Sequence, residues 1–179
     1  MPALSDCVAA VAFAGDAERW IRRFKYPPRG LAGLDPGPGA VIRELAREVA
    51  RRAPGPPPNL VVPVPLHPRK LRARAFNPAA LIAREIARTR KARFAPRALS
   101  RVRDTESQTG LDRRARARNV AGAFHARGPA PRDIWLVDDV VTTGATLAEA
   151  ARELRRAGAR RVVGVCLAWT RRSPRADPG

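Results

Sequence analysis

The stretch Ile134 to Thr146, IWLVDDVVTTGAT, decides the fold. Its first four residues are apolar, which is typical of a buried strand in a parallel sheet. Two carboxylates, Asp138 and Asp139, come next, followed by a loop of small and hydroxyl-bearing residues and a predicted helix over residues 147–157. A strand that enters a helix through such a loop presents free backbone N–H groups and the positive end of the helix dipole to an anion. The stretch therefore predicts a phosphate cradle, in which Gly144 allows close backbone approach.

The carboxylates beside this cradle indicate a sugar phosphate rather than phosphate alone. Carboxylates accept hydrogen bonds from ribose hydroxyls, and they position a magnesium ion directly or through water. We expect Asp138 and Asp139 in both roles, and the phosphate on Val140, Val141, Thr142, Thr143, Gly144, Ala145 and Thr146. The alternative is an ordinary strand–helix turn whose Asp and Thr side chains serve as caps.

The same segment resembles the phosphoribosyl-pyrophosphate (PRPP) signature of type I phosphoribosyltransferases. That signature consists of apolar residues, two acidic residues, two apolar residues and then T-T-G-x-T, and every position is matched here. The resemblance implies a type I phosphoribosyltransferase fold and a ligand that carries a ribose 5′-phosphate. PRPP and a nucleoside 5′-monophosphate both meet that description, and Mg²⁺ is the implied cofactor.

Composition favours one globular domain with phosphate-rich partners. The chain has 179 residues, 45% hydrophobic and 28% charged, and a net charge of +19. Such an excess of positive charge favours nucleotides, pyrophosphate or nucleic acid. The alternative is a GC-rich coding bias, because Lys25, Lys70 and Lys91 are the only lysines among the 35 basic residues.

Several classes of protein are not expected from this sequence. No apolar run approaches the roughly 20 residues of a membrane span, and no basic leader precedes the apolar patch near the N-terminus. The two cysteines, Cys7 and Cys166, indicate neither a disulfide framework nor a zinc site, and Cys166 lies in an apolar run that predicts burial. We expect a cytoplasmic location.

Strands and helices alternate along the chain, which predicts an α/β fold with a mainly parallel sheet flanked by helices. Ligands of such sheets bind beyond the carboxyl ends of the strands. We expect a small N-terminal hood over residues 1–58, a core over 59–170 and a disordered tail over 171–179. The expected strands are 59–64, 93–99, 120–126, 134–138 and 161–169. The expected helices are 20–26, 40–52 and 147–157, with a further helix that Asn77 caps and that has Pro78 at its first position. The expected loops are 65–76 and 100–119.

Three further stretches narrow the resemblance to the ComF family of competence-associated, GntX-like proteins. PVPLHPRKLRARAFN, over residues 63–77, is similar to that family's PVPLHxxRxxxRGFNQ segment. Phe24-Lys25-Tyr26 resembles its early LKY element, and RDTESQTGLDRRARARNVAGAF, over residues 103–124, resembles its R-x-T-x-x-Q-x-x-L…R…N-V-x-G-A-F stretch. With the signature, the resemblance covers residues 20–169.

The chain departs from the family pattern in three respects. Ala75 stands where the family usually has Gly, and Pro78 stands where it usually has Gln. If that glycine needs a positive φ, the loop geometry differs here. The four-cysteine zinc module of many relatives is not expected, because only Cys7 precedes Trp20.

A PRPP site also needs cations for pyrophosphate. We expect them from Arg69, Lys70, Arg72 and Arg74 in the basic loop over residues 65–76. In the place of the flexible catalytic loop of type I enzymes, Arg103 and Arg114 are expected to meet the pyrophosphate together with the neutral side chain of Gln108. Arg103 and Gln108 join Asp138 and Asp139 as the expected catalytic residues. The alternatives are a solvated basic loop and an exposed basic helix over residues 113–118.

Trp169 ends the last predicted strand and is expected to border the base pocket, where its indole stacks on a nucleobase. The alternative is a core or rim tryptophan.

The favoured function is transfer of phosphoribose from PRPP to a base or amine, with release of pyrophosphate. The ComF resemblance implies an alternative, which is a non-catalytic nucleotide sensor or a handler of single-stranded DNA in natural competence, with a helicase-like ATPase as partner. A fold alone does not decide between them. Aromatic residues form only 5% of the chain, which gives little support to base-stacking platforms. A homodimer is one alternative for the assembly.

Overall fold

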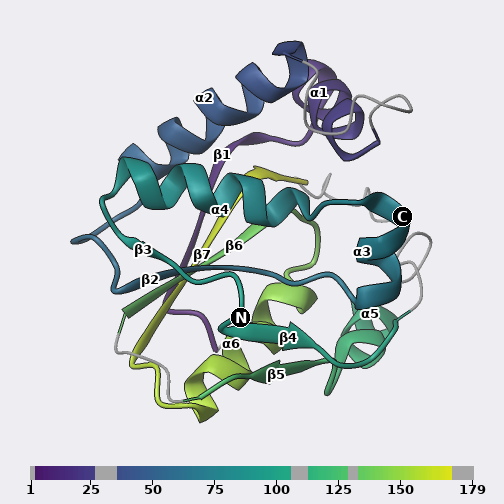
Figure 1. Cartoon of the computed structure of the whole chain (residues 1–179), viewed down its shortest axis with the longest axis vertical. Coiled ribbons are helices and arrows are strands. Elements are labelled where there is room, and N and C mark those ends of the chain that lie inside the picture. Colours follow the sequence, from purple (N-terminus) through teal and green to yellow (C-terminus); the bar gives the residue numbers. More distant parts are fainter. Residues whose placement is uncertain (1–2, 27–35, 106–112, 129–132, 171–179) are drawn as a thin grey trace, which may run out of the picture.

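Five parallel strands form the central sheet, in the order β1-β7-β6-β2-β3 (Figure 1). The computed structural model describes residues 3–26, 36–105, 113–128 and 133–170. The strands are β1 (Asp6–Ala12), β7 (Arg161–Trp169), β6 (Asp133–Val141), β2 (Leu60–Pro63) and β3 (Arg93–Phe94). The mainly parallel sheet that the sequence predicts is confirmed.

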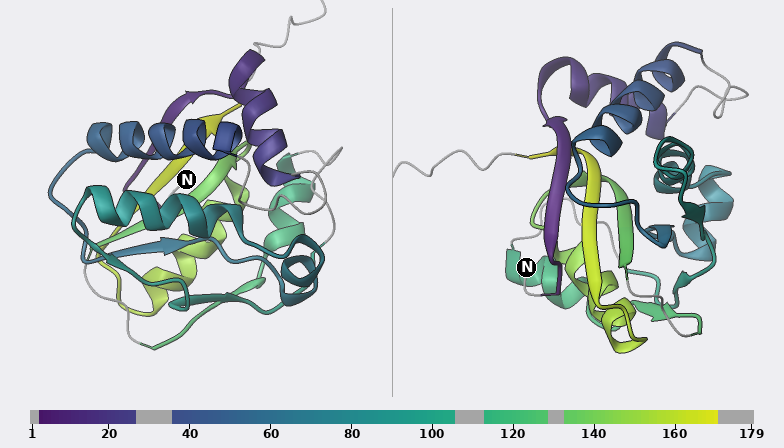
Figure 2. Two further views of the ribbon diagram at one scale, coloured as in Figure 1. Left: turned by 45° about the horizontal axis from the view of Figure 1, so that its top comes forward. Right: turned by 90° about the vertical axis from the view of Figure 1, so that its left-hand side faces the viewer.

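Helices cover both faces of this sheet (Figure 2). One face carries α1 (Gly15–Lys25), α2 (Pro36–Arg52) and α4 (Pro78–Thr89). The other carries α6 (Ala145–Arg156), the adjoining α5 (Arg113–Val120) and a two-stranded antiparallel sheet of β4 (Leu99–Arg101) and β5 (Phe124–Ala126). The short helix α3 (Pro68–Arg74) follows β2.

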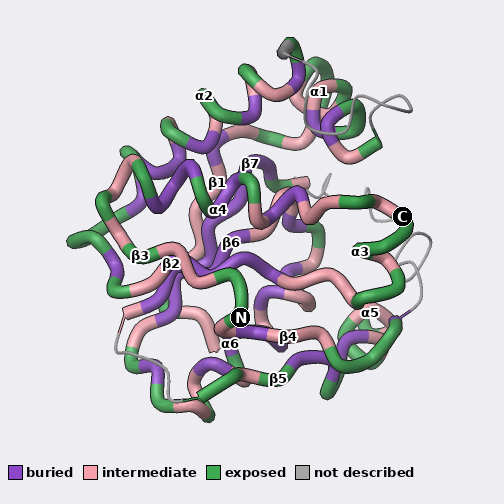
Figure 3. Tube along the Cα trace, viewed as in Figure 1, coloured by how far each residue is buried: buried purple, intermediate pink, exposed green. Residues whose placement is uncertain are grey.

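β6 lies between β7 and β2 and contributes to both cores. Successive side chains of a strand point to opposite faces. Trp135 and Val137 therefore pack on the α1–α2–α4 side, and Ile134 and Leu136 pack on the α6 side. All four are almost fully buried, and the strand is purple along this stretch in Figure 3. The guanidinium of Arg90 lies 4.8 Å from the ring centroid of Trp135.

Several elements agree with the prediction in type, and some of them also agree in extent. β7 has the predicted bounds, and Asn77 accepts a hydrogen bond from the Ala79 N–H as the predicted N-cap of α4. β6 continues to Val141, so Asp139 also lies inside the strand, which was predicted to end at Asp138. α1 and α2 begin several residues before the predicted starts at residues 20 and 40.

Two predictions about loops and strands are wrong, and a third, a mobile loop over residues 100–119 with partial helix as the alternative, agrees in part. The basic loop over 65–76 contains α3, because Pro68 suits the first turn of a helix and His67 Nδ1 accepts from the Arg69 N–H at 3.4 Å. The strand expected over 93–99 ends at Phe94, and Leu99 begins β4 in the second sheet. Residues 100–119 contain part of β4 and most of α5.

Strand β1 was not expected. It pairs in parallel with β7, from Asp6 opposite Val163 to Ala12 opposite Trp169. The division of the chain at residue 58 stays a prediction, but one strand from before that point belongs to the main sheet. The expected disordered tail over 171–179 lies outside the described residues.

Cys166 is buried, as its apolar surroundings predict. Within the described ranges, no helix combines the length and the apolar character that a membrane crossing requires.

Ala75 ends α3 in the left-handed region, with a φ of 67°. Glycine adopts this conformation freely, whereas a residue with a Cβ is strained there. The glycine that the ComF pattern has at this position is thus explained by the turn, and this chain forms the turn with alanine. The Ala75 N–H donates to the Leu71 carbonyl at 2.8 Å, which closes the last turn of α3.

We predict that Ala75→Gly raises the free energy of unfolding by roughly 0.5–1 kcal/mol, because relief of the left-handed strain exceeds the added entropy of the unfolded chain. Ala73→Gly is the control: Ala73 is exposed inside α3, and the change there should cost about 0.5–1 kcal/mol. Urea unfolding measures both, and equal destabilisation by the two changes would contradict the prediction.

Candidate functional site

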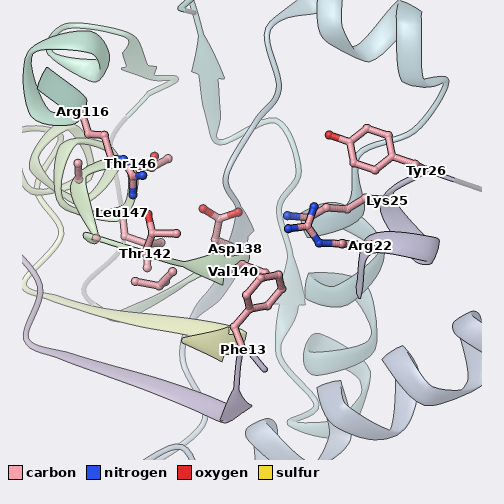
Figure 4. Close-up of a pocket in the computed structure, with 13 residues that line it drawn as sticks. Phe13, Arg22, Lys25, Tyr26, Arg116, Asp138, Val140, Thr142, Thr146 and Leu147 are labelled. Carbon is pink, nitrogen blue, oxygen red and sulfur yellow. The ribbon is translucent and has the colours of Figure 1, made fainter. Parts of the chain in front are cut away.

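A cavity of about 480 Å³ opens at the carboxyl ends of the central strands (Figure 4). This size is ordinary for a small-molecule site. The loop over residues 142–144 and Arg116 of α5 lie on one side of the cavity, α1 lies on the other, and Asp138 lies between them. The lining residues are Phe13, Arg22, Lys25, Tyr26, Arg116, Asp138, Val140, Val141, Thr142, Gly144, Ala145, Thr146 and Leu147.

The two adjacent carboxylates have different surroundings. Asp139 forms an ion pair with Lys25, whose Nζ lies 3.0 Å from Oδ1, and both side chains are largely shielded from solvent. Asp138 is half-buried and lines the cavity. Its Oδ1 accepts a hydrogen bond from the Asp139 N–H at 2.9 Å. Of the pair, Asp138 is therefore the carboxylate available to a ligand in the cavity.

Asp138 is hard to ionise in this setting. Burial raises its pKa to about 7, and the negative charge of Asp139 acts in the same direction. Lys25, the Asp139 N–H and Arg101 lower the pKa without cancelling that rise. A nearby cation or a set of hydroxyl donors would favour the ionised form.

The threonine loop, residues 142–144, joins β6 to α6. Gly144 has a φ of 76° immediately before the first turn of α6, where its lack of a Cβ permits that conformation. Thr143 Oγ1 accepts a hydrogen bond from the N–H of Ala145, the first residue of α6, at 3.4 Å. Thr142, Gly144 and Thr146 line the cavity at the positive end of the α6 dipole.

The end of α1 forms the opposite wall, which sequence reasoning did not anticipate. Lys25 holds this end of α1 to β6 through Asp139, and the guanidinium of Arg74 lies 4.7 Å from the ring centroid of Tyr26. Arg22 also lines the cavity and is paired with Glu18 one turn earlier. The Phe24-Lys25-Tyr26 element was the one sequence signal for this wall.

The cations expected from the basic loop do not line the cavity. Arg69 is exposed and lies 3.7 Å from the carboxylate of Asp104, and Arg72 is also exposed. Lys70 is half-buried, and its Nζ donates to the Thr105 carbonyl at 2.6 Å. Burial, and then the charge of Arg101, lower the pKa of Lys70.

The three residues expected from the catalytic loop have different surroundings. Arg103 donates to the carbonyls of Asn119 and Ala121 at 2.8 and 2.6 Å, so it satisfies the C-terminal end of α5. Arg114 is exposed on α5 and does not line the cavity. Gln108 lies outside the described residues.

Trp169 is 37% exposed at the end of β7 and is not among the residues that line the cavity. The aromatic side chains that do line it are Phe13 and Tyr26. The stacking role of Trp169 stays a prediction.

Two arginines close to the site were missed. Arg116 lines the cavity, and its spacing in the run RRARARNV did not distinguish it from its neighbours. Arg101 is half-buried and donates to Thr105 Oγ1, and burial lowers its pKa.

Within the described ranges, no group of three or more His, Cys, Asp or Glu side chains could hold a metal ion. Mg²⁺ commonly uses one or two protein carboxylates and takes its remaining ligands from water and substrate phosphates. Asp138 in the cavity fits that mode of binding, whereas an all-protein metal site does not fit.

Comparison with known proteins identifies the family of this chain. The model of the phosphoribosyl transferase domain matches residues 75–178, which is more than half of the chain. The chain belongs to the phosphoribosyl transferase domain family.

The relatives of this phosphoribosyl transferase domain include competence proteins, which confirms the resemblance to the ComF family. It is 40% identical over 135 residues to the DNA utilization protein YhgH of Salmonella typhi, covering 73% of this chain and 60% of that protein. It is 30% identical over 142 residues to competence protein F of Haemophilus influenzae, covering 77% and 61%. The chain thus spans about 60% of the length of these relatives.

Among solved structures, the phosphoribosyl transferase domain is similar to the protein TT1426 from Thermus thermophilus. The sequence identity is 18% and the TM-score is 0.44, over 77% of this chain and 86% of that one.

We predict that Asp138→Asn stabilises this phosphoribosyl transferase domain at high pH. The pKa of Asp138 is raised on folding, so stability falls as pH rises from about 4 to about 7, and the cost of the buried charge is complete above pH 7. A neutral amide removes that cost. The gain in free energy of unfolding should be on the order of 1–3 kcal/mol at pH 8 and shrink toward zero near pH 4.

Thermal or urea unfolding between pH 5 and pH 8 measures this gain. Asp133→Asn, at the opposite end of β6, serves as the matched control and should show no comparable growth of stability with pH. If Asp138→Asn raises the free energy of unfolding equally at all pH values, the raised pKa of Asp138 is contradicted.

Proposed function

We propose that this domain binds PRPP, or a nucleoside 5′-monophosphate, together with Mg²⁺, and that it transfers phosphoribose from PRPP to a base or amine with release of pyrophosphate. The observation that carries the proposal is the position of Asp138 in one cavity with the threonine loop. A ribose 5′-phosphate needs both: an anion cradle for the phosphate and a carboxylate for the sugar hydroxyls.

In this proposal the threonine loop binds the 5′-phosphate through backbone N–H groups and the hydroxyls of Thr142 and Thr146. Asp138 accepts hydrogen bonds from the ribose hydroxyls, and Asp139 contributes indirectly by fixing Lys25 and α1. Bound Mg²⁺ would neutralise charge that develops on the departing pyrophosphate. No protein nucleophile is required, since positioning and electrostatic stabilisation supply the rate enhancement.

For the pyrophosphate we assign Lys70 and Arg101, which do not line the cavity themselves; Arg101 is close enough to Asp138 for that carboxylate to act on its pKa. Both are half-buried, and the charge of Arg101 acts to lower the pKa of Lys70. An entering pyrophosphate would relieve that repulsion and compensate for the cost of burying both charges. The other three arginines of the basic loop are assigned a lesser part. Arg69 contacts the carboxylate of Asp104, Arg74 contacts the ring of Tyr26, and Arg72 faces solvent.

The first experiment measures PRPP affinity with and without Mg²⁺ by calorimetry. Asp138→Asn should weaken binding at least about tenfold, because the ribose hydroxyls and the metal lose their carboxylate partner. Asp133→Asn should bind like the unmodified protein. The proposal is abandoned if PRPP binds neither Asp138 form or binds both equally.

Turnover is tested separately, by measuring pyrophosphate release from PRPP with a panel of bases and amines. Tight PRPP binding without release by any acceptor would favour the sensing role and remove the transferase role.

A second candidate function is handling of single-stranded DNA, which the names of the DNA utilization protein YhgH and competence protein F favour. A groove of about 830 Å³ at the amino ends of β2, β3 and β6 offers a surface for it. Arg93, Arg97 and Arg127 line this groove, and no acidic side chain is among its described lining residues. It lies at the opposite end of the sheet from the cavity proposed for PRPP, so both ligands could bind together.

We expect the triple change Arg93→Ala, Arg97→Ala, Arg127→Ala to weaken binding of a single-stranded oligonucleotide. Loss of three phosphate contacts should reduce the slope of log affinity against log salt by about 2. The control removes three arginines that are already paired with glutamates, namely Arg51, Arg88 and Arg156. Both triple variants lose three positive charges. If they weaken oligonucleotide binding equally, binding depends on net charge and the groove is excluded as the site.

A further inference from the structure

We propose that Arg116 of α5 is the residue that makes this cavity selective for a phosphate monoester, by forming a paired hydrogen bond with the terminal phosphate beside Thr146. This inference rests on the proposed function of the same site, to which it adds a recognition residue and a class of ligand.

Arg116 differs from the other described arginines of its helix. Arg114 and Arg118 are exposed, whereas Arg116 is half-buried. α5 packs against α6, and from there the side chain of Arg116 extends toward Thr146 and Thr142 at the start of α6 (Figure 4). Residues two apart on a helix point to nearly opposite sides. The guanidinium of Arg116 therefore reaches the cavity, whereas those of Arg114 and Arg118 lie in solvent.

The guanidinium of Arg116 has a donor that the protein does not satisfy. Its Nε is fully buried and has no hydrogen-bond partner, and none of the acidic side chains in the described ranges forms an ion pair with Arg116. A buried donor without an acceptor costs roughly 1–3 kcal/mol. Among the described residues, the Nε atoms of Arg90 and Arg101 are likewise buried without a partner. Of these three arginines only Arg116 lines the cavity, where a ligand can approach its guanidinium.

The chemistry of the surroundings identifies that ligand as an anion with several oxygens. The α6 N-terminus favours negative charge, and Thr142 and Thr146 carry hydroxyl groups. A guanidinium binds phosphate through two parallel N–H···O bonds. A monoester leaves three free phosphate oxygens and up to two charges, enough to occupy the helix end, the threonines and Arg116 at once. A diester lacks the third oxygen and is disfavoured.

The test compares Arg116→Met, Arg116→Lys and Arg118→Met, using PRPP, AMP and adenosine as ligands in calorimetry. Arg116→Met should weaken PRPP and AMP about tenfold to a hundredfold and leave adenosine unaffected. Arg116→Lys should restore part of the loss, because it keeps the charge but not the fork. Arg118→Met, two residues along the same helix and exposed, should bind like the unmodified protein.

Thermal unfolding of the ligand-free variants separates recognition from a purely structural role. Removal of an unpaired buried donor should leave the melting temperature of Arg116→Met unchanged or higher. A lower melting temperature with unchanged AMP affinity would make Arg116 a structural residue and overturn the inference.

The outcomes also distinguish this inference from the proposed function. If AMP binds and PRPP does not, the transferase proposal fails and Arg116 is tested on AMP alone. If PRPP binds Arg116→Met as tightly as the unmodified protein, the inference fails and the PRPP site stands. If none of the ligands binds the unmodified protein, both fail.

Discussion

The alternation of side chains along β6 is the constraint on which the site depends. Two carboxylates adjacent in a strand point to opposite faces of the sheet. Asp139 consequently meets Lys25 on the α1 side, and that ion pair holds one wall of the cavity in place. Asp138 is left half-buried in the cavity, where burial and then the negative charge of Asp139 raise its pKa. One local rule thus gives, from the dipeptide Asp-Asp, one carboxylate held in an ion pair and one that faces the cavity.

Features fixed by neighbouring residues were the ones that sequence reasoning could predict. The threonine loop, the Asn77 cap and the bounds of β7 follow from local patterns of apolar, capping and glycine residues. The partners of Lys25 and the pairing of β1 with β7 depend on residues more than about a hundred positions away, so no local pattern contains them. The inward orientation of Arg116 depends on how α5 docks on α6, which is equally non-local.

An arginine-rich chain makes basic residues poor markers of an anion site. Many guanidiniums here satisfy carbonyl groups at loops and helix ends: Arg103 binds those of Asn119 and Ala121, and Arg90 binds that of Gly55 while stacking on Trp135. Charge along the sequence therefore predicts the class of partner but not the contacts. A buried Nε without a protein acceptor is shared by Arg90, Arg101 and Arg116 in the described part of the chain, and of these only Arg116 also lines the cavity.

The pairing of β1 with β7 has a consequence for synthesis of the protein. Asp6–Ala12 has no neighbour in the sheet until Arg161–Trp169 has been made. A ribosome adds about 5–20 residues per second, so the first strand waits roughly ten seconds or longer for its partner. Throughout that interval its hydrogen-bonding groups are open to other chains, as are those of any unpaired strand edge. The order of strands in the sheet therefore makes the nascent chain most vulnerable to mispairing at its own N-terminal strand.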